Sequence, residues 1–488
     1  MAEKEDLVEI VGSEGVSDAP EILAEYSKDK SFVPPIEPRC VVKPKTTEEV
    51  QRIIKWANDT LTPLIPVSSG SPRFRGDTVP TAGGAAVLDL SGMKKILWID
   101  RRNRVAMIEP GVTFGELRPE VEKEGLRLLM PLLPRRSKSV LASALEREPI
   151  IMPRYHWDIG DPMLCTEVVF GTGDLFRTGA AAGPGTLEEQ RKSGQAQKNP
   201  AGPSQASLHR VIQGSQGTMG CVTWITLKTQ LLPKLQKPFL VGSHRLDSLT
   251  ELSHWLIRLR IADECLMLNN SNLAAIMAKK WPEEYRRLRD NLPSWILFFC
   301  QAGYEYFPEE RLAYEEEYMS DIAQRIGVSP VEVLSGVSAY ELLAILQAPS
   351  EEPYWKLRHK GSCHDIFFLT GRDRLPELIE VMHNLASRYS YPVADMGIYI
   401  QPVVQGTSWH CEFNLFFDPD DLKEVETVRT LSVDAVNALM TEGAFFSRPY
   451  GPWADIAYRR DGETTAALRK VKGIFDPNNI MNPGKLCF

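Results

Sequence analysis

The sequence lacks a long apolar run, an excess of one charge and an N-terminal signal. No stretch approaches the ~20 apolar residues that a membrane-spanning helix requires. The formal net charge is −8, from 56 basic and 64 acidic residues, without a long run of one sign, so the basic surface typical of nucleic-acid-binding proteins is missing. Residues 1–14 are acidic, with no basic stretch followed by an apolar one. We therefore expect a soluble, cytoplasmic protein that binds no nucleic acid.

Closely spaced cysteines are missing as well. Eight cysteines are scattered along the chain and none forms a Cys-x-x-Cys pair. Zinc knuckles and ferredoxin-type clusters both need closely spaced thiolates. Most of the cysteines have apolar neighbours, as in Phe298-Phe299-Cys300, which is typical of small buried side chains in a reducing compartment. Any redox chemistry must therefore depend on an organic cofactor.

The length and composition indicate a globular protein of two or three domains. Of the 488 residues, 43% are hydrophobic and 25% charged. Up to residue 235, helices alternate with short strands; Thr46 and Glu49 fit a capping box, and residues 64–67 read as a buried strand. Residues 178–207 are rich in Gly, Ala, Pro, Ser, Gln and Lys, and predict a long loop outside the core.

The second half has a different pattern. Strands are predicted at residues 295–300, 364–369 and 410–417, and amphipathic helices at 309–326 and 375–390. This pattern predicts an α+β domain with an antiparallel sheet. The proline-containing segment 231–238 marks its start, so the predicted domains are 1–235 and 236–430, followed by a C-terminal segment, 431–488.

Two glycine-rich turns are candidates for binding a pyrophosphate. Pro66-Val-Ser-Ser-Gly-Ser71 follows a strand, and Gly214-Ser-Gln-Gly-Thr-Met-Gly220 precedes one. Glycine allows backbone amides to approach a phosphate closely. Neither turn matches the Rossmann fingerprint or the nucleotide-binding loop that ends in Gly-Lys-Ser/Thr. Each alone is better explained as an ordinary turn.

Taken in order, however, these turns and their neighbours resemble a known superfamily. The motifs are Pro44-Lys-Thr-Thr-Glu-Glu-Val50, the turn at 66–71, Val87-Leu-Asp-Leu90, Glu109-Pro-Gly-Val-Thr113, Glu167-Val-Val-Phe-Gly-Thr-Gly-Asp174, the turn at 214–220, and Phe475-Asp-Pro-Asn-Asn-Ile-Met-Asn-Pro-Gly-Lys485. The series resembles the vanillyl-alcohol oxidase / p-cresol methylhydroxylase superfamily of FAD enzymes. Within it, the likeness is greatest to the branch that contains the flavoprotein of glycolate oxidase and D-lactate dehydrogenase.

The resemblance implies a fold and a cofactor site. It implies a two-part FAD-binding domain in residues 1–235, to which residues 431–488 return, and an α+β cap domain in between. Members with covalent flavin often carry a histidine in the loop at residues 69–73; this sequence has none there, so we expect non-covalent FAD. The expected FAD-binding residues are Pro66, Val67, Ser68, Ser69, Gly70, Ser71, Ser139, Ser143, Gly214, Ser215, Gly217, Thr218, Gly220 and Val222.

The substrate side departs from the D-lactate branch. That branch uses a His-x6-His pair and a later Glu-His to hold a divalent metal. Here His410 matches the second histidine, but Val403 replaces the first and Arg448-Pro449 stands near the Glu-His position. One imidazole does not hold a metal against water, so we predict no metal. His410 would act as the base, Arg448 would bind a carboxylate and Tyr450 would donate a hydrogen bond to the substrate.

Simpler interpretations of these residues stay open. His410 could be a packed strand residue, and Arg448 could form a salt bridge with a core carboxylate. Arg358, His359 and His364 lie in a polar stretch that is better explained as a solvated face than as a substrate contact.

The predicted function is that of an FAD-dependent dehydrogenase oxidising a 2-hydroxy acid by hydride transfer to flavin N5. Its electrons would pass to a separate iron–sulfur, cytochrome or electron-transfer flavoprotein subunit, and we expect an oligomer. Two alternatives remain: oxidation of a 4-alkylphenol at its benzylic carbon, and a flavin-carrying subunit whose catalysis takes place elsewhere in a larger complex.

Overall fold

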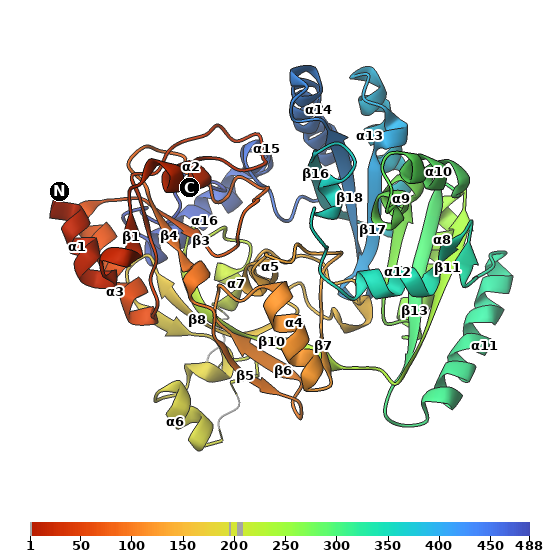
Figure 1. Ribbon diagram of the computed structural model, residues 1–488, viewed down its shortest axis with the longest axis horizontal. Helices are drawn as coiled ribbons and strands as arrows, with labels where there is room; N and C mark the ends of the chain where they lie inside the picture. Colours follow the sequence, from red (N-terminus) through yellow and green to blue (C-terminus); the bar gives the residue numbers. More distant parts are fainter. Residues whose placement is uncertain (1, 195–196, 203–207) are drawn as a thin grey trace.

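The computed structural model describes residues 2–194, 197–202 and 208–488. Two lobes lie side by side (Figure 1). The first contains the N-terminal half of the chain together with its C-terminal end, and the second contains the middle of the chain. Among the described residues, no helix is both long and apolar enough to cross a bilayer.

The first lobe contains a small, mostly parallel sheet. Its strand order is β1 (Val16–Ser17), β2 (Cys40–Val42), β4 (Ala86–Asp89) and β3 (Leu64–Val67). Helix α3 (Thr47–Thr60) packs on one face with α1 (Ala2–Val11), and α2 (Pro20–Ser27) packs on the other. The Thr46 side chain caps α3 by accepting a hydrogen bond from the Glu49 amide at 3.2 Å, as expected from the capping pattern.

A second sheet of the same lobe is antiparallel. It runs in the order β5 (Ile96–Asp100), β6 (Val105–Ile108), β10 (Gly220–Leu231), β8 (Met163–Phe170) and β9 (Leu175–Arg177), and β7 (Leu126–Leu128) pairs with the end of β10. Helices α4 (Phe114–Lys123) and α5 (Val140–Leu145) contribute to the core on one of its faces. The expected long loop contains a short helix, α6 (Leu187–Lys192), followed further on by α7 (His209–Ile212); its residues 195–196 and 203–207 lie outside the described part.

The cap is built on a six-stranded antiparallel sheet, as predicted. The strand order is β11 (Leu235–Ser243), β13 (Trp295–Gly303), β12 (Cys265–Asn269), β17 (Gly397–Val403), β18 (Ser408–Phe417) and β16 (Ser362–Thr370). One face packs against α8 (Leu246–Arg258), α11 (Pro308–Ile326), α13 (Leu375–Arg388) and α14 (Leu422–Thr441). The other face packs against α9 (Asn270–Met277), α10 (Glu283–Asn291) and α12 (Ala339–Leu346).

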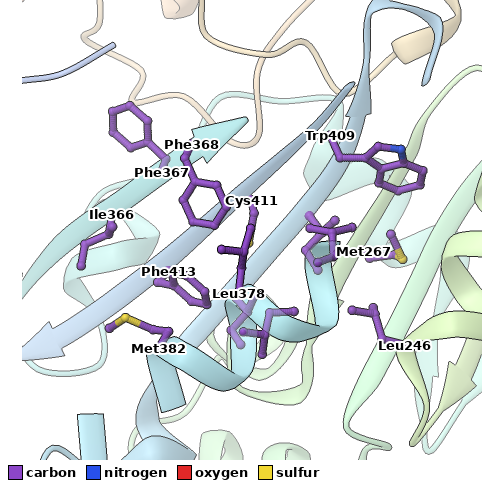
Figure 2. Close-up of a cluster of buried hydrophobic side chains, with 14 of the residues drawn as sticks. Leu246, Met267, Ile366, Phe367, Phe368, Leu378, Met382, Trp409, Cys411 and Phe413 are labelled. Carbon is purple, nitrogen blue, oxygen red and sulfur yellow. The ribbon is translucent and has the colours of Figure 1, made fainter. Parts of the chain in front are cut away.

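Side-chain alternation on β18 determines what the cap presents to the first lobe. Trp409, Cys411 and Phe413 belong to the core beneath the helices, where Leu378 and Met382 of α13 lie (Figure 2). Because successive strand residues point to opposite faces, His410 and Glu412 point the other way. Both of them line the cavity between the lobes.

The C-terminal segment returns to the first lobe through α15 (Pro452–Tyr458) and α16 (Gly462–Phe475). The Leu64 amide donates to the Ile480 carbonyl at 2.7 Å, and the Asn482 amide donates to the Leu64 carbonyl at 2.9 Å. The cap sheet starts at Leu235, beside the expected boundary, but α14 runs without a break across the expected boundary at 430/431. Since α14 buries Leu431 and Ala435 in the cap core, we propose that the cap ends at Thr441.

Candidate active site

The main cavity lies between the cap sheet and the loops of the first lobe. Twelve of the seventeen predicted site residues line it: Pro66, Val67, Ser68, Ser69, Gly214, Ser215, Gly217, Gly220, Val222, His410, Arg448 and Tyr450. They come from β3 and the turn after it, from the loop before β10 and the start of β10, from β18 and from the segment before α15. The fold thus brings residues about 380 positions apart to one cavity.

The other five predicted residues do not line the cavity: Gly70, Ser71, Ser139, Ser143 and Thr218. The Ser139 hydroxyl donates to the Pro110 carbonyl at 2.6 Å and caps α5, and the Ser143 hydroxyl donates to Glu148 at 2.6 Å. The Thr218 hydroxyl donates to the Ser215 carbonyl at 2.7 Å. These hydroxyls complete the local structure behind the wall, whereas Lys138, Leu141 and Ala142 form the wall itself.

The turn after β3 has amide groups available for an anion. The amides of Ser68, Ser69 and Ser71 donate no hydrogen bond to any described residue, while the Gly70 amide donates to the Ser137 carbonyl at 3.3 Å. In the facing turn, the amide of Gly217 is equally unpartnered within the described chain. Amides without a protein partner are suited to bind phosphate oxygens, so the two turns fit the diphosphate of FAD.

The two turns also approach each other closely. Gly217 has a φ of +72°, and a Cβ there would lie 3.0 Å from the Pro66 ring. Gly214, at φ +70°, faces the Arg147 guanidinium, which would lie 2.6 Å from an added Cβ. The positive φ favours glycine at both positions, and at Gly217 the Pro66 ring also leaves little space for a side chain.

On the first-lobe side, the carboxylates of the wall already have cationic partners. Lys138 lies 2.9 Å from Glu146 and 2.8 Å from Glu148, and Arg75 lies 3.7 Å and 3.5 Å from the same two carboxylates. Although burial opposes ionisation, Lys138 and Arg75 hold the pKa of Glu148 well below its ordinary value. Glu148 is therefore ionised, and both carboxylates already have cationic partners.

On the cap side, a second charged network surrounds His410. Lys356 lies 2.6 Å from Glu412 and 2.7 Å from Asp365, and Asn414 donates to both carboxylates at 2.8 and 2.7 Å. The His410 Nε2 atom lies 3.6 Å from Glu412, too far for a hydrogen bond. Burial lowers the pKa of His410, and Glu412 only partly offsets this effect. The ring is therefore neutral at pH 7 and able to accept a proton.

Arg448 has no carboxylate partner among the described residues. It is only 5% exposed, its guanidinium lies 4.3 Å from the centre of the Phe367 ring, and it donates one long hydrogen bond, 3.5 Å, to the Glu146 carbonyl. The alternative of a salt bridge with a core carboxylate is thus not seen. Buried arginines are normally paired, so Arg448 is suited to bind an anionic ligand.

Two further buried arginines of the cavity wall also lack a carboxylate partner among the described residues. Arg73 donates to the Glu25 carbonyl at 2.6 Å, and Arg135 donates to the Gly70 carbonyl at 3.0 Å. Neither pairs with a described carboxylate, and each is 7% exposed. The cavity wall therefore holds three buried guanidiniums that have no carboxylate partner among the described residues.

The structure corrects the interpretation of residues 358–364 as a solvated face. His364 packs between the rings of Phe32 and Trp453, at 4.8 and 5.4 Å, and burial lowers its pKa to about 4. The His359 ring lies 4.2 Å from Tyr285. The hydrophilic composition of this stretch did not predict that both histidines contact aromatic side chains.

Sequence reasoning missed several residues of the wall: Arg75, Lys138, Glu148, Tyr354, Lys356, Asp365, Tyr399 and Glu412. One signal was present, because Glu412 follows His410 by two positions on a strand and must share its face. In the described parts of the chain, no group of three or more His, Cys, Asp or Glu side chains is arranged to hold a metal ion. All eight cysteines are free thiols, and seven are buried.

Comparison with known proteins agrees with this geometry. Residues 38–179 match the model of an FAD binding domain, and residues 454–486 match that of the C-terminal domain of FAD linked oxidases. The chain is thus an FAD-linked oxidoreductase, with relatives named as oxidases and dehydrogenases. FAD is accordingly its cofactor, and the family resemblance inferred from the ordered motifs is confirmed.

Relatives of this flavoprotein match it over nearly their whole length. It is 24% identical to the glycolate oxidase subunit GlcD of Bacillus subtilis, over 99% of this chain and 96% of the relative. It is 26% identical to the 4-cresol dehydrogenase [hydroxylating] flavoprotein subunit of Pseudomonas putida, over 98% and 93%. The crystal structure of p-cresol methylhydroxylase with substrate bound has the same fold, with a TM-score of 0.81 and 18% identity over 100% of this chain and 96% of that one.

Proposed function

We propose that this flavoprotein is a dehydrogenase of a hydroxylated organic acid of the 2-hydroxy acid type. The observation that carries the proposal is Arg448, a buried guanidinium at the wall that has no carboxylate partner among the described residues. A planar guanidinium can bind a carboxylate through two parallel hydrogen bonds. Relatives whose names refer to glycolate and D-lactate support this class of substrate.

The chemistry requires a proton acceptor beside that anchor. FAD, when bound, would accept the hydride from the substrate carbon. His410 is neutral because it is buried, and it is close enough to Arg448 for the guanidinium to help lower its pKa. A neutral imidazole can remove the hydroxyl proton. Glu412, held ionised by Lys356, would stabilise the imidazolium that results.

A second candidate is oxidation of a 4-alkylphenol at its benzylic carbon. It is favoured by the aromatic wall of Tyr354, Tyr399 and Tyr450 and by the Tyr450 hydroxyl, which has no hydrogen-bond partner within the described chain. An arginine and a tyrosine together could stabilise a phenolate as well as a carboxylate. The name of the 4-cresol dehydrogenase relative supports this candidate.

We propose that the electrons leave through a separate acceptor subunit carrying an iron–sulfur cluster, a haem or a second flavin. The relative from Pseudomonas putida is itself named as a flavoprotein subunit. The cysteines of this chain are isolated buried thiols rather than a cluster-binding set.

Anaerobic stopped-flow reduction of the yellow protein tests the proposal. A panel of 2-hydroxy acids and 4-alkylphenols is mixed with the protein while the flavin absorbance is followed. We expect a 2-hydroxy acid to bleach the flavin, Arg448→Met to raise its half-saturating concentration ~10–100-fold, and His410→Ala to slow the reduction ~10²–10⁴-fold.

The matched controls are Arg325→Met, an exposed arginine on α11, and His383→Ala, a histidine on α13 that does not line the cavity. Neither control should change the reduction. Bleaching by phenols alone would favour the second candidate. A flavin that no member of the panel reduces would favour a subunit whose catalysis takes place elsewhere.

A further inference from the structure

A second, smaller cavity lies against the main one. It has a volume of about 90 Å³, several times the ~10–15 Å³ that one water molecule needs. Phe74, Arg75, Cys363, Asp365 and Tyr450 line both cavities. These five side chains therefore form part of the boundary between the two cavities.

The wall of the side cavity is mostly apolar and aromatic. Its apolar side chains include Phe32, Val33, Val433, Pro452 and Trp453. They come from the N-terminal segment, from α14 and from the start of α15, so the cavity lies where the two ends of the chain meet the cap. Ring faces and edges of this kind favour contact with another aromatic ring.

Two polar groups of this wall, the Tyr450 hydroxyl and a ring nitrogen of His364, have no hydrogen-bond partner among the described residues. His364 is held between Phe32 and Trp453, and its Nε2 atom is buried without a hydrogen bond to any described residue. The lowered pKa keeps the ring neutral at pH 7, so the ring nitrogen can form a hydrogen bond with a neutral group. A buried polar atom without a partner is unfavourable, and a ligand could satisfy it.

Arg75 stands at the junction of the cavities. Its guanidinium lies 4.5 Å from the Phe367 ring centre and 5.3 Å from that of Tyr450. Its ion pairs with Glu146 and Glu148 are long, at 3.7 and 3.5 Å. This long side chain is therefore held mainly by stacking, and it forms part of the wall of both cavities.

We propose that the side cavity binds the distal aryl group of the substrate, and that His364 forms a hydrogen bond with a polar substituent on that ring. The proposal rests on the proposed function, because the carboxylate of the same molecule would be held by Arg448. It narrows the substrate class to aryl-substituted acids with a hydroxyl or similar group on the ring.

Three ligands that cannot be oxidised at a 2-hydroxyl test this binding: propanoate, 3-phenylpropanoate and 3-(3-hydroxyphenyl)propanoate. Their dissociation constants are measured from the change in flavin absorbance. Burial of the ring should tighten binding roughly 100-fold over propanoate, and the ring hydroxyl should add roughly 10-fold more.

Two variants separate the parts of the proposal. Val433→Phe fills the side cavity, so the preference for 3-phenylpropanoate over propanoate should fall to less than threefold. His364→Phe should abolish the tenfold preference for the ring hydroxyl, whereas the matched control His383→Phe should retain it. Because each result is a ratio between two ligands on one variant, a partly folded preparation does not change it.

An aryl preference that survives Val433→Phe, or that is absent in the unmodified protein, would overturn the assignment of the side cavity. A hydroxyl preference that survives His364→Phe would overturn the role of His364. The ratios are independent of turnover, so a failure of 2-hydroxy acids to reduce the flavin would contradict the proposed function and leave this test intact.

Discussion

Arg127 links the two lobes through a buried ion-pair cluster, and its removal is expected to destabilise the protein strongly. It extends from β7 of the first lobe and lies 2.5 Å from Asp263 and 2.8 Å from Glu264, which precede β12 of the cap. The exposed fractions of the three side chains are 8%, 0% and 2%. The Tyr304 hydroxyl also donates to Asp263.

The Arg127→Met variant keeps most of the side-chain volume but removes the guanidinium that pairs with Asp263 and Glu264. Breaking a buried pair by removing one partner typically costs about 3–5 kcal/mol of the free energy of unfolding. Asp263 would retain Arg154 at 3.0 Å, whereas Glu264 would retain only Gln347 at 3.4 Å. Most of the loss should therefore come from Glu264.

The loss should depend on pH. Burial already raises the pKa of Glu264, against the opposing effect of Arg127, and removal of the cation would raise this pKa further. Protonation then favours the folded state, so the loss is complete above the folded-state pKa and shrinks as the pH falls towards the unfolded value.

Urea unfolding at pH 8 and pH 5, followed by far-UV circular dichroism and by the fluorescence of released flavin, measures the effect. Arg429→Met is the control, because its ion pair with Glu426 is more than half exposed and should contribute at most ~1 kcal/mol. The double variant Arg127→Met/Glu264→Gln should recover part of the stability. A loss below 1 kcal/mol, or one that does not shrink at pH 5, would refute the reasoning.

Two further predictions concern the cofactor turn and acid stability. The Gly217→Val variant should purify without FAD, because a Cβ would force the turn away from Pro66; the ratio of absorbance at 450 and 280 nm measures the bound FAD. The control variant Gly83→Val, where a Cβ meets open space, should stay yellow. A Gly217→Val protein fully loaded with FAD would contradict the assignment of this turn to the cofactor. His156 is 1% exposed, and burial lowers its pKa to about 4. Below pH 6.5 the unfolded chain binds a proton at this histidine that the folded protein does not bind, so the free energy of unfolding should fall by about 3 kcal/mol by pH 4. In urea titrations, the free energy of unfolding of His156→Gln should fall less steeply with decreasing pH over this range. A pH dependence as steep as that of the unmodified protein would disprove the role of His156.

Much of the cap could be predicted because its elements obey simple periodicities. The alternation in His410-Cys-Glu-Phe-Asn-Leu-Phe-Phe417 predicted a strand, and β18 covers it. The helix predicted at 309–326 is α11, which begins one residue earlier. Both patterns reflect a buried apolar face, which the spacing of apolar residues within the segment is enough to predict.

The wall of the active site was less predictable because its charged residues pair across the fold. Lys138 and Lys356 each form ion pairs with two carboxylates, but only the tertiary structure brings these strands and loops together. Ser139 and Ser143 were expected at the flavin from a loose likeness, and their hydroxyls instead complete local hydrogen bonds. His364 was expected to be solvated because its sequence neighbours are polar, although its spatial neighbours Phe32 and Trp453 come from distant segments.

The distribution of charge on the wall connects cofactor, substrate and stability. The carboxylates Glu146, Glu148, Asp365 and Glu412 already have lysine partners, while the guanidiniums without a described carboxylate partner are Arg73, Arg135 and Arg448. Burying a guanidinium without a carboxylate partner is unfavourable, so these three arginines are suited to contact anionic groups of ligands. The FAD diphosphate is one such group, and the carboxylate of the proposed substrate would be another. FAD and a substrate anion should therefore each stabilise the fold, in addition to their roles in the reaction.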